Sequence, residues 1–275
     1  MLVQNIKMRR QTMISTFKSD NILPTSTTYQ SRLQLFQPTR RPKAIDRIIE
    51  TAWGKIRIKG RIGQAHADIF EAMLSACDKH KIIDDGRIRL LIDPYRISQI
   101  SNQNSWSSFK KNLDDLKQAL IEIREPQRLK CIGHLIDHIG TARQRNGSVI
   151  TKSNPFGGVR ELWIIELGKV GTTLINYDLR IFYDTKKIAN LTHGISQAIA
   201  RHILTHKTQP NGGWLLDRLI LVTGAAARSL RDRRRELRQD ALLLVKLGIF
   251  ISNGHVEYKR GGLEYKRGEA NFCGA

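Results

Sequence analysis

Residues 226–259 read AARSLRDRRRELRQDALLLVKLGIFISNGHVEYK, and this stretch decides the fold. At 100° per residue its apolar side chains form one stripe of the kind that faces a core, made of Ala226, Leu230, Leu237, Ala241 and Leu244. We therefore expect a helix from about Ala226 to Leu247. After Gly248, the pair Asn253-Gly254 separates Ile249–Ile251 from His255–Lys259, which is typical of a β-hairpin with a two-residue loop.

Two shorter helices are expected directly upstream. Apolar residues at helical spacing predict a helix from about Ile195 to His206, and Gly212-Gly213 ends it. A second helix is predicted from Leu215 to Val222, before Gly224. Two short helices, a long helix and a hairpin are the order of a winged helix, a variant of the helix-turn-helix.

The first half of the chain repeats this order. We expect a helix from His66 to His80, a strand at Ile88–Ile92, a short helix from Pro94 and a longer helix from Ser105 to Arg124. An apolar run at 129–139, a polar connection containing Asn146-Gly147 and a strand at 162–167 follow. The sequence thus predicts a helix-rich α+β fold with two tandem winged-helix domains.

The two ends differ from this pattern in composition. Residues 1–43 are rich in Ser, Thr, Gln and Arg and lack helical periodicity, so we expect a flexible basic N-terminal arm. The predicted domains are 44–176 and 177–260, joined by a linker within 176–193. A basic tail at 261–275 completes the chain; the motif EYKRG at 257–261 recurs at 264–268.

Charge points to a polyanionic partner. Lys and Arg number 46 against 25 Asp and Glu, a formal net charge of +21, although a merely soluble basic protein has the same composition. Cys77, Cys131 and Cys273 lack the spacing of zinc ligands or of a disulfide framework, which favours reduced thiols in a cytoplasm. No apolar run approaches the roughly 18 residues of a membrane span, and no signal peptide is evident.

The long helix predicted at 226–247 carries its charges on separate sides. Arginines at spacings of three, four and three share one flank, whereas Asp232, Glu236 and Asp240 lie on the other. Arginine grips a phosphate or the edge of guanine with two hydrogen bonds, and a helix fits the major groove of DNA. A solvated helix laced with ion pairs is the alternative. The candidate DNA contacts in this half are Arg228, Arg231, Arg234, Arg235, Arg238, Lys259 and Arg260.

We interpret Arg228 and Arg231 as base readers, and Arg235, Arg238, Lys259 and Arg260 as phosphate contacts. The equivalent helix of the first half carries Lys110 and Lys111, which we add as candidate DNA contacts. Asp114 and Asp115 offset them, so this half either touches DNA lightly or serves in subunit association.

Catalytic motifs are absent from the sequence. Gly168-Lys169 lacks the remaining residues of a phosphate-binding loop, and His202 and His206 lack the glutamate of a metalloprotease helix. No His-x-His pair and no carboxylate cluster of a two-metal nuclease occurs. We expect a protein that is not an enzyme and needs no cofactor or metal.

Three segments resemble the plasmid replication initiators built from tandem winged helices: GRIGQAHADIFEA at 60–72, GGWLLDRLI at 212–220 and LRDRRRELR at 230–238. The resemblance covers residues 45–260. It implies a bacterial cytoplasmic protein, associated with plasmid or nucleoid, that binds directly repeated double-stranded sites at an origin and helps to open the adjacent duplex. It further implies recruitment of the host initiator and replicative helicase, and autoregulation as a homodimer through the first domain.

Two other functions fit the same residues. A winged-helix transcriptional repressor would bind an inverted repeat instead of direct repeats, and a DNA nickase or recombinase would cleave DNA. The N-terminal arm has no counterpart in the family that the motifs resemble.

Overall fold

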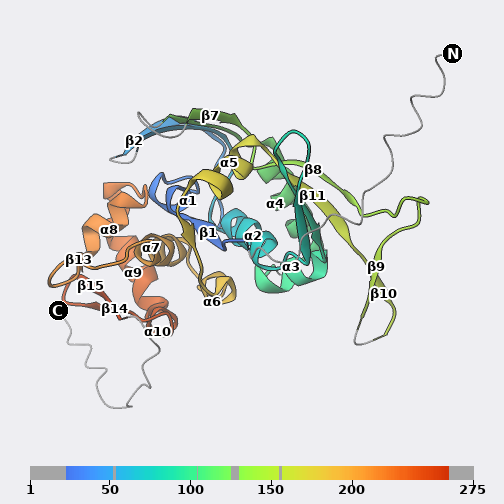
Figure 1. Ribbon diagram of the computed structural model, residues 1–275. Coiled ribbons are helices and arrows are strands. Elements are labelled where there is room, and N and C mark those ends of the chain that lie inside the picture. The colour runs from blue at the N-terminus through green and yellow to red at the C-terminus, as the bar shows by residue number, and fades with distance from the viewer. Residues whose placement is uncertain (1–22, 52–53, 104, 125–129, 155–156, 260–275) are drawn as a thin grey trace.

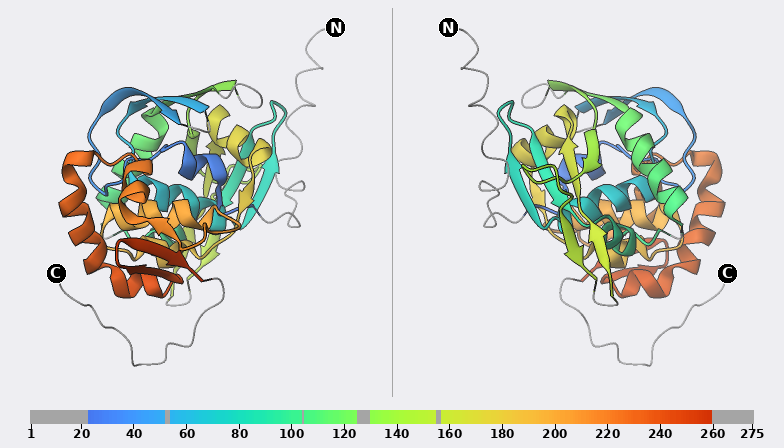
Figure 2. Two further views of the ribbon diagram at one scale, coloured as in Figure 1. Left: turned by 90° about the vertical axis from the view of Figure 1, so that its left-hand side faces the viewer. Right: turned by 90° about the vertical axis from the view of Figure 1, so that its right-hand side faces the viewer.

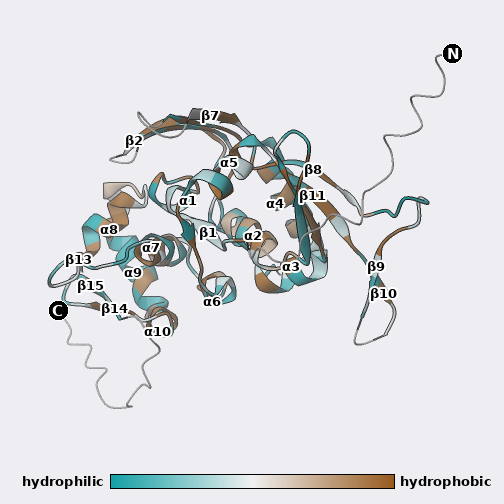
Figure 3. Cartoon of the chain, in the orientation of Figure 1, coloured by the Kyte–Doolittle hydropathy of each residue, from teal (hydrophilic) through white to brown (hydrophobic). Residues whose placement is uncertain are grey.

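The computed structural model describes residues 23–51, 54–103, 105–124, 130–154 and 157–259. Helices and strands are mixed along the chain, so the fold is α+β, as expected (Figure 1). In Figure 3, α8 and α9 carry both apolar and polar residues, as do helices that turn one face to a core. No helix among these residues is long and apolar enough to cross a membrane.

The first half contains a helix, strands and two further helices around an antiparallel sheet. The sheet order is β4-β5-β11-β8. The elements are α2 (Gln64–Ser75), β4 (Lys79–Ile82), β5 (Ile88–Ile92), α3 (Pro94–Ile100), α4 (Trp106–Gln118), β8 (Ile136–Thr141) and β11 (Trp163–Leu167).

The three-stranded sheet of the second half repeats part of this topology with shorter strands. Its sheet order is β13-β15-β14. This order matches β5-β11-β8 of the first half, because in each set of three the strand that comes last in the chain lies in the middle. The elements are α7 (Gly194–Leu204), β13 (Trp214–Leu215), α8 (Leu216–Val222), the 3₁₀ turn η2 (Ala227–Ser229), α9 (Leu230–Gln239), α10 (Ala241–Val245), β14 (Ile249–Ser252) and β15 (His255–Tyr258).

A second sheet of the first half was not predicted. It has the order β2-β3-β6-β7 and arches above α1 and α5 in Figure 1. Its strands are β2 (Ile45–Thr51), β3 (Gly54–Gly60), β6 (Leu120–Arg124) and β7 (Lys130–Gly133). Ile56 and Ile58 are fully buried and alternate with exposed Lys55, Arg57 and Lys59, which is the period-two pattern of a strand with one face on the core.

The remaining elements are short or connect the halves. They are β1 (Ser26–Thr27), α1 (Thr28–Arg32), the hairpin of β9 (Thr151–Ser153) and β10 (Val159–Glu161), α5 (Lys169–Tyr177), β12 (Arg180–Ile181) and α6 (Thr185–Ala189). The predicted linker at 176–193 therefore contains a strand and a helix, because β12 pairs with β1 and Ile188 is buried in the second core.

The predicted flexible arm is wrong for residues 23–43. Leu33, Leu35 and Phe36 are at most 4% exposed and belong to the core of the first half. These three apolar side chains lie among polar residues and lack helical spacing, so the periodicity of the sequence did not predict that they are buried. Residues 1–22 and the predicted tail at 261–275 lie outside the described residues.

Two predicted helices of the first half end earlier than expected. The helix predicted at 66–80 ends at Ser75, because Lys79–Ile82 pairs with β5. The helix predicted at 105–124 ends at Gln118, because Leu120–Arg124 pairs with β3 and buries Ile121 and Ile123. In both cases strand pairing outweighs the local helical pattern.

Two separate apolar cores result. The first contains buried residues between Leu33 and Ile175, the second those between Ile188 and Val256, and they share no member. The division of the chain into domains at residue 176 stays a prediction.

Candidate nucleic-acid interface

The helix predicted at 226–247 is divided into three pieces. η2, α9 and α10 follow one another, and Asp240 stands between α9 and α10 as the C-cap of the one and the N-cap of the other. The Asp240 side chain is buried and accepts hydrogen bonds from the backbone N–H groups of Thr192 (3.1 Å) and His193 (2.9 Å). The predicted single helix is therefore wrong at this residue, where the chain is tied to the start of α7.

The apolar stripe of this segment meets the second core as predicted at three positions. Leu237 and Leu244 are buried, and Leu230 packs half-buried against the same cluster. Ala226, by contrast, is exposed. This anchoring fixes which side of α9 is left to solvent.

The arginines of the solvent-facing side differ in how they are neutralised. The Arg234 guanidinium forms a bidentate pair with Asp217 of α8, and its Nε donates to Oδ1 at 2.8 Å. This hydrogen-bonded pair raises the pKa of Arg234 and lowers that of Asp217. Arg235 lies 3.4 Å from Asp232, with both side chains more than 60% exposed. Such an exposed contact is weak and is easily exchanged for another anion.

Arg231 and Arg238 are exposed, and neither forms an ion pair within the described part of the chain. Together with Arg235 they stand at spacings of four and three, which places them on one flank of α9. Arg228 belongs to η2, just before α9. The structure thus brings a basic flank to the surface, as the charge spacing predicts, and Arg234 stands out as the arginine already satisfied by a carboxylate.

The predicted hairpin is present beside α9. Asn253 and Gly254 have φ of 47° and 75°, the left-handed values that a two-residue turn between twisted strands requires. Lys259 follows β15; it is exposed, and its Nζ lies 5.3 Å from the centre of the Phe250 ring. Arg260 lies outside the described residues.

In the first half, α4 occupies the position that α9 has in the second. Ser105 caps its N-terminus by accepting from the N–H of Ser108 at 3.1 Å. Lys110 and Lys111 are exposed, and Lys110 lies 5.7 Å from the centre of the Trp106 ring. Both views of Figure 2 place α4 and α9 on the same side of the molecule. Of the two carboxylates expected to offset the lysines, Asp115 contacts His66 at 3.3 Å instead.

His202 of α7 and His206, just beyond its C-terminus, form a close pair. The Nε2 atoms of His202 and His206 are 3.3 Å apart, and burial, with the His206 and Arg32 charges, lowers the pKa of His202 to about 4. Across the described ranges, no three His, Cys, Asp or Glu side chains gather into a possible metal site.

Comparison with known proteins gives two related findings. No family model and no curated protein matches the sequence. The structure is similar to a crystal structure of selenomethionine derivatives of domains 2 and 3 of RctB, with a TM-score of 0.48 and 12% identity, covering 86% of this chain and 96% of that chain. A second crystal structure of RctB domains 2–3 gives a TM-score of 0.46 at 12% identity, covering 81% of this chain and 87% of that one.

Proposed function

We propose that this protein binds double-stranded DNA in a sequence-specific manner. The observation that carries the proposal is the flank of α9 on which Arg231 and Arg238 are exposed without a carboxylate partner among the described residues. Such a flank attracts phosphates. Leu237 on the opposite side of α9 is buried in the core, so the arginine flank faces solvent. A formal charge of +21 adds long-range attraction to the same partner.

The order of elements supports a specific mode of binding. In both halves a helix, a strand, two further helices and two antiparallel strands follow one another along the chain, with β4, β6, β7, β9 and β10 inserted in the first half. This order supports a winged helix with α4 and α9 as recognition helices. We propose tandem winged helices in which α9 enters the major groove. Arg228 and Arg231 then read base edges, while Arg235 and Arg238 with the wing residues Lys259 and Arg260 hold phosphates. Arg234 lies on the same helix, but Asp217 holds its guanidinium. Lys110 and Lys111 contact the backbone from the first half.

The sequence motifs at 60–72, 212–220 and 230–238 favour a role in plasmid replication. We propose an initiator in the bacterial cytoplasm that binds direct repeats at an origin, recruits the host initiator and helicase, and regulates its own gene as a homodimer. In this role the protein acts by binding, without catalysis and without a cofactor.

A footprint on the DNA that flanks the gene tests this proposal. We expect protection of an array of direct repeats about two helical turns long each, roughly 20 base pairs. Protection of a single inverted repeat would instead identify a repressor. Metal-dependent nicking of the same fragment, abolished by a point mutation, would identify a nickase or recombinase.

The matched controls lie on the same helix. The double variant Arg231→Ala/Arg238→Ala should lose the footprint, whereas Arg234→Ala should retain most of it, because the Arg234 charge is already shared with Asp217. Equal loss in both variants would mean that net charge, and not this flank, determines binding.

A further inference from the structure

The two apolar cores meet through polar side chains. We call this region the polar junction and define it by seven residues: Gln30, Gln64, Asp68, Glu71, Tyr183, Gln197 and Arg201. All except Tyr183 are at most 3% exposed. Most of them lie on α2 and α7, of which α2 contributes apolar residues to the first core and α7 to the second, and Tyr183 packs against the second core.

Arg201 of α7 is the centre of the polar junction. Its Nε donates to both carboxylate oxygens of Glu71, at 2.9 and 3.0 Å, and its Nη2 donates to Asp68 at 2.6 Å and to Glu71 at 2.9 Å. Its Nη1 donates to Gln64 Oε1 at 2.7 Å. The guanidinium thus bonds to three side chains at i, i+4 and i+7 on one face of α2.

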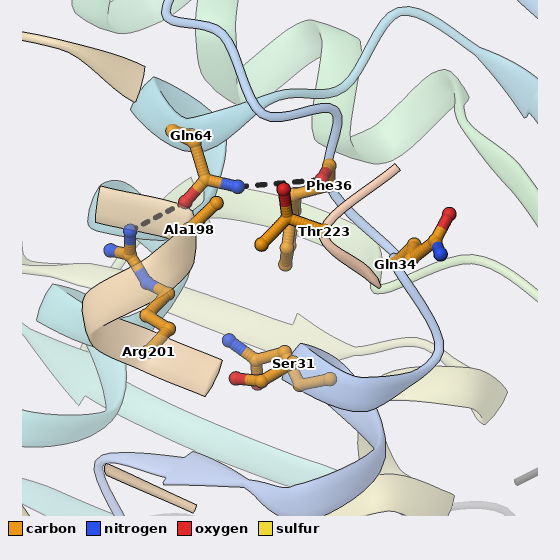
Figure 4. Close-up of a pocket in the computed structure, with 8 residues that line it drawn as sticks. Ser31, Gln34, Phe36, Gln64, Ala198, Arg201 and Thr223 are labelled. Carbon is orange, nitrogen blue, oxygen red and sulfur yellow. Dashed lines mark hydrogen bonds between the residues drawn. The ribbon is translucent and has the colours of Figure 1, made fainter. Parts of the chain in front are cut away.

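Other members of the polar junction donate further hydrogen bonds to the two carboxylates. Gln197 donates to Asp68 at 3.0 Å, and the Tyr183 hydroxyl donates to Glu71 at 2.6 Å. Gln30 of α1 donates to Glu71 at 3.0 Å. Figure 4 shows Arg201 and Gln64 joined in this way, with Gln64 also bonded to Phe36. A cavity of about 20 Å³ beside them has room for about one water molecule.

The starts of the same two helices are also held together. Thr39 lies between Gly63, which precedes α2, and Gly194, which begins α7. A Cβ on Gly63 would come within 2.5 Å of Thr39 O, and one on Gly194 within 2.4 Å of Thr39 Cα. Only glycine permits this approach at both places. The two helices are therefore joined at their N-termini by backbone packing and along their length by the polar junction.

Joining α2 to α7 fixes the relation between the two proposed recognition helices. α2 contacts α4, and α7 contacts α9. A fork of hydrogen bonds to buried carboxylates depends on direction more strongly than apolar contact does, so it favours one arrangement of the two helices. Since α4 and α9 lie on the same side of the molecule, this arrangement sets the distance between them along a DNA duplex (Figure 2).

We propose that the polar junction acts as a ruler: it makes the spacing between two half-sites on DNA a determinant of specificity, with Arg201 as its positioning residue. This inference rests on the proposed function. One added base pair moves the second half-site by about 3.4 Å and turns it by about 35°. A rigidly joined pair of helices cannot follow that change without losing contacts to one half-site.

The first test uses the wild-type full chain and a library of 40-base-pair duplexes with random centres. We expect selected sequences to contain two conserved blocks at one constant separation. Insertion of one base pair between them should weaken binding at least about tenfold, comparable to a mismatch in a base contact. A single conserved block, or two blocks at variable separation, would overturn the ruler but leave DNA binding intact. Absence of any enrichment would overturn the proposed function itself.

The second test asks whether the ion pairs of Arg201 set the preferred spacing of the half-sites. The variant Asp68→Asn/Glu71→Gln/Arg201→Met removes the charges without leaving one buried and unpaired. It should tolerate the one-base-pair insertion with a loss of less than about threefold, while its affinity for each half-site alone is unchanged. A merely structural effect would weaken all spacings alike. The matched control, Asp46→Asn/Arg57→Met, removes an exposed ion pair of the β2–β3 hairpin and should keep the wild-type spacing preference.

If the triple variant does not fold, Gln197→Ala replaces it. This change removes the 3.0 Å bond to Asp68, together with the bonds to the carbonyls of Ile188 and Ala189, and keeps Arg201. We expect an intermediate tolerance of the insertion. An unchanged spacing preference in the folded variant would show that the polar junction does not set the separation.

Discussion

At the scale of single residues, neutralisation by neighbours separates arginines that look equivalent in the sequence. Arg231→Ala should cost about 1–3 kcal/mol of binding free energy and relax the preference at one base pair. Arg234→Ala should cost less, because Asp217 already holds its guanidinium. Fluorescence anisotropy on specific and random duplexes measures both. An equal loss on the two duplexes for Arg231→Ala would refute its role in base reading.

Lys259 at the end of the hairpin is expected to behave differently. Its exposed ammonium is a point charge suited to a phosphate, so Lys259→Ala should weaken binding to all sequences alike. The slope of log affinity against log salt should fall by about one unit, the value for one lost phosphate contact. A sequence-dependent loss would place Lys259 against bases instead.

His202 links stability to pH. Burial lowers its pKa in the folded protein to about 4, below the ordinary value of 6.5, so the unfolded chain binds a proton first as the pH falls. Stability should therefore be full above pH 6.5 and decrease by up to about 3 kcal/mol towards pH 4. Urea unfolding across this range should show a shallower decrease for His202→Gln than for the wild type. His255→Gln, at an exposed site, is the control and should leave the slope unchanged.

At the scale of elements, the sequence predicts those that local chemistry determines. The hairpin at Asn253-Gly254 is confirmed because its turn needs two left-handed residues, and the short helix from Pro94 is confirmed because proline suits a first turn. Residues 120–124 were misassigned to a helix, since they pair with β3 residues that lie 61 to 69 positions earlier in the chain. The alternation in Lys55–Lys59 would have revealed that partner strand.

The break between α9 and α10 at Asp240 is a second feature that the local sequence pattern did not predict. On a helical wheel Asp240 belongs to the acidic side of a continuous helix, but its carboxylate is buried and binds two N–H groups before α7. Asp240→Ala should lower the free energy of unfolding by about 1.5–3 kcal/mol, because hydrogen bonds to a charged group are lost and the N–H groups stay buried. Thermal unfolding measures the change. Asp232→Ala, at an exposed position of α9, should change stability by less than about 0.5 kcal/mol.

At the scale of the whole molecule, the candidate interface was easier to predict than the way its halves are joined. Charge separation on one helix is visible in the sequence, so the basic flank of α9 was found. The polar junction was missed although it leaves a trace in the sequence. Gln64, Asp68 and Glu71 stand at i, i+4 and i+7 in α2, and Gln197 and Arg201 stand four apart in α7. The sequence does not show that α2 and α7 contact each other, because that contact depends on the whole fold.

The polar junction also predicts how the whole molecule responds to losing a charge. Arg201→Ala leaves the buried Glu71 carboxylate without its cation and Asp68 with only Arg40 at 3.8 Å, and should destabilise the fold by about 3–5 kcal/mol. Asp68→Asn/Glu71→Gln/Arg201→Met removes all three charges at similar volume and should recover most of that loss. Urea unfolding at neutral pH compares the two variants with the wild type. Equal destabilisation by both would mean that hydrogen bonds and packing, and not the unpaired charges, account for the cost, because the triple variant carries no net buried charge.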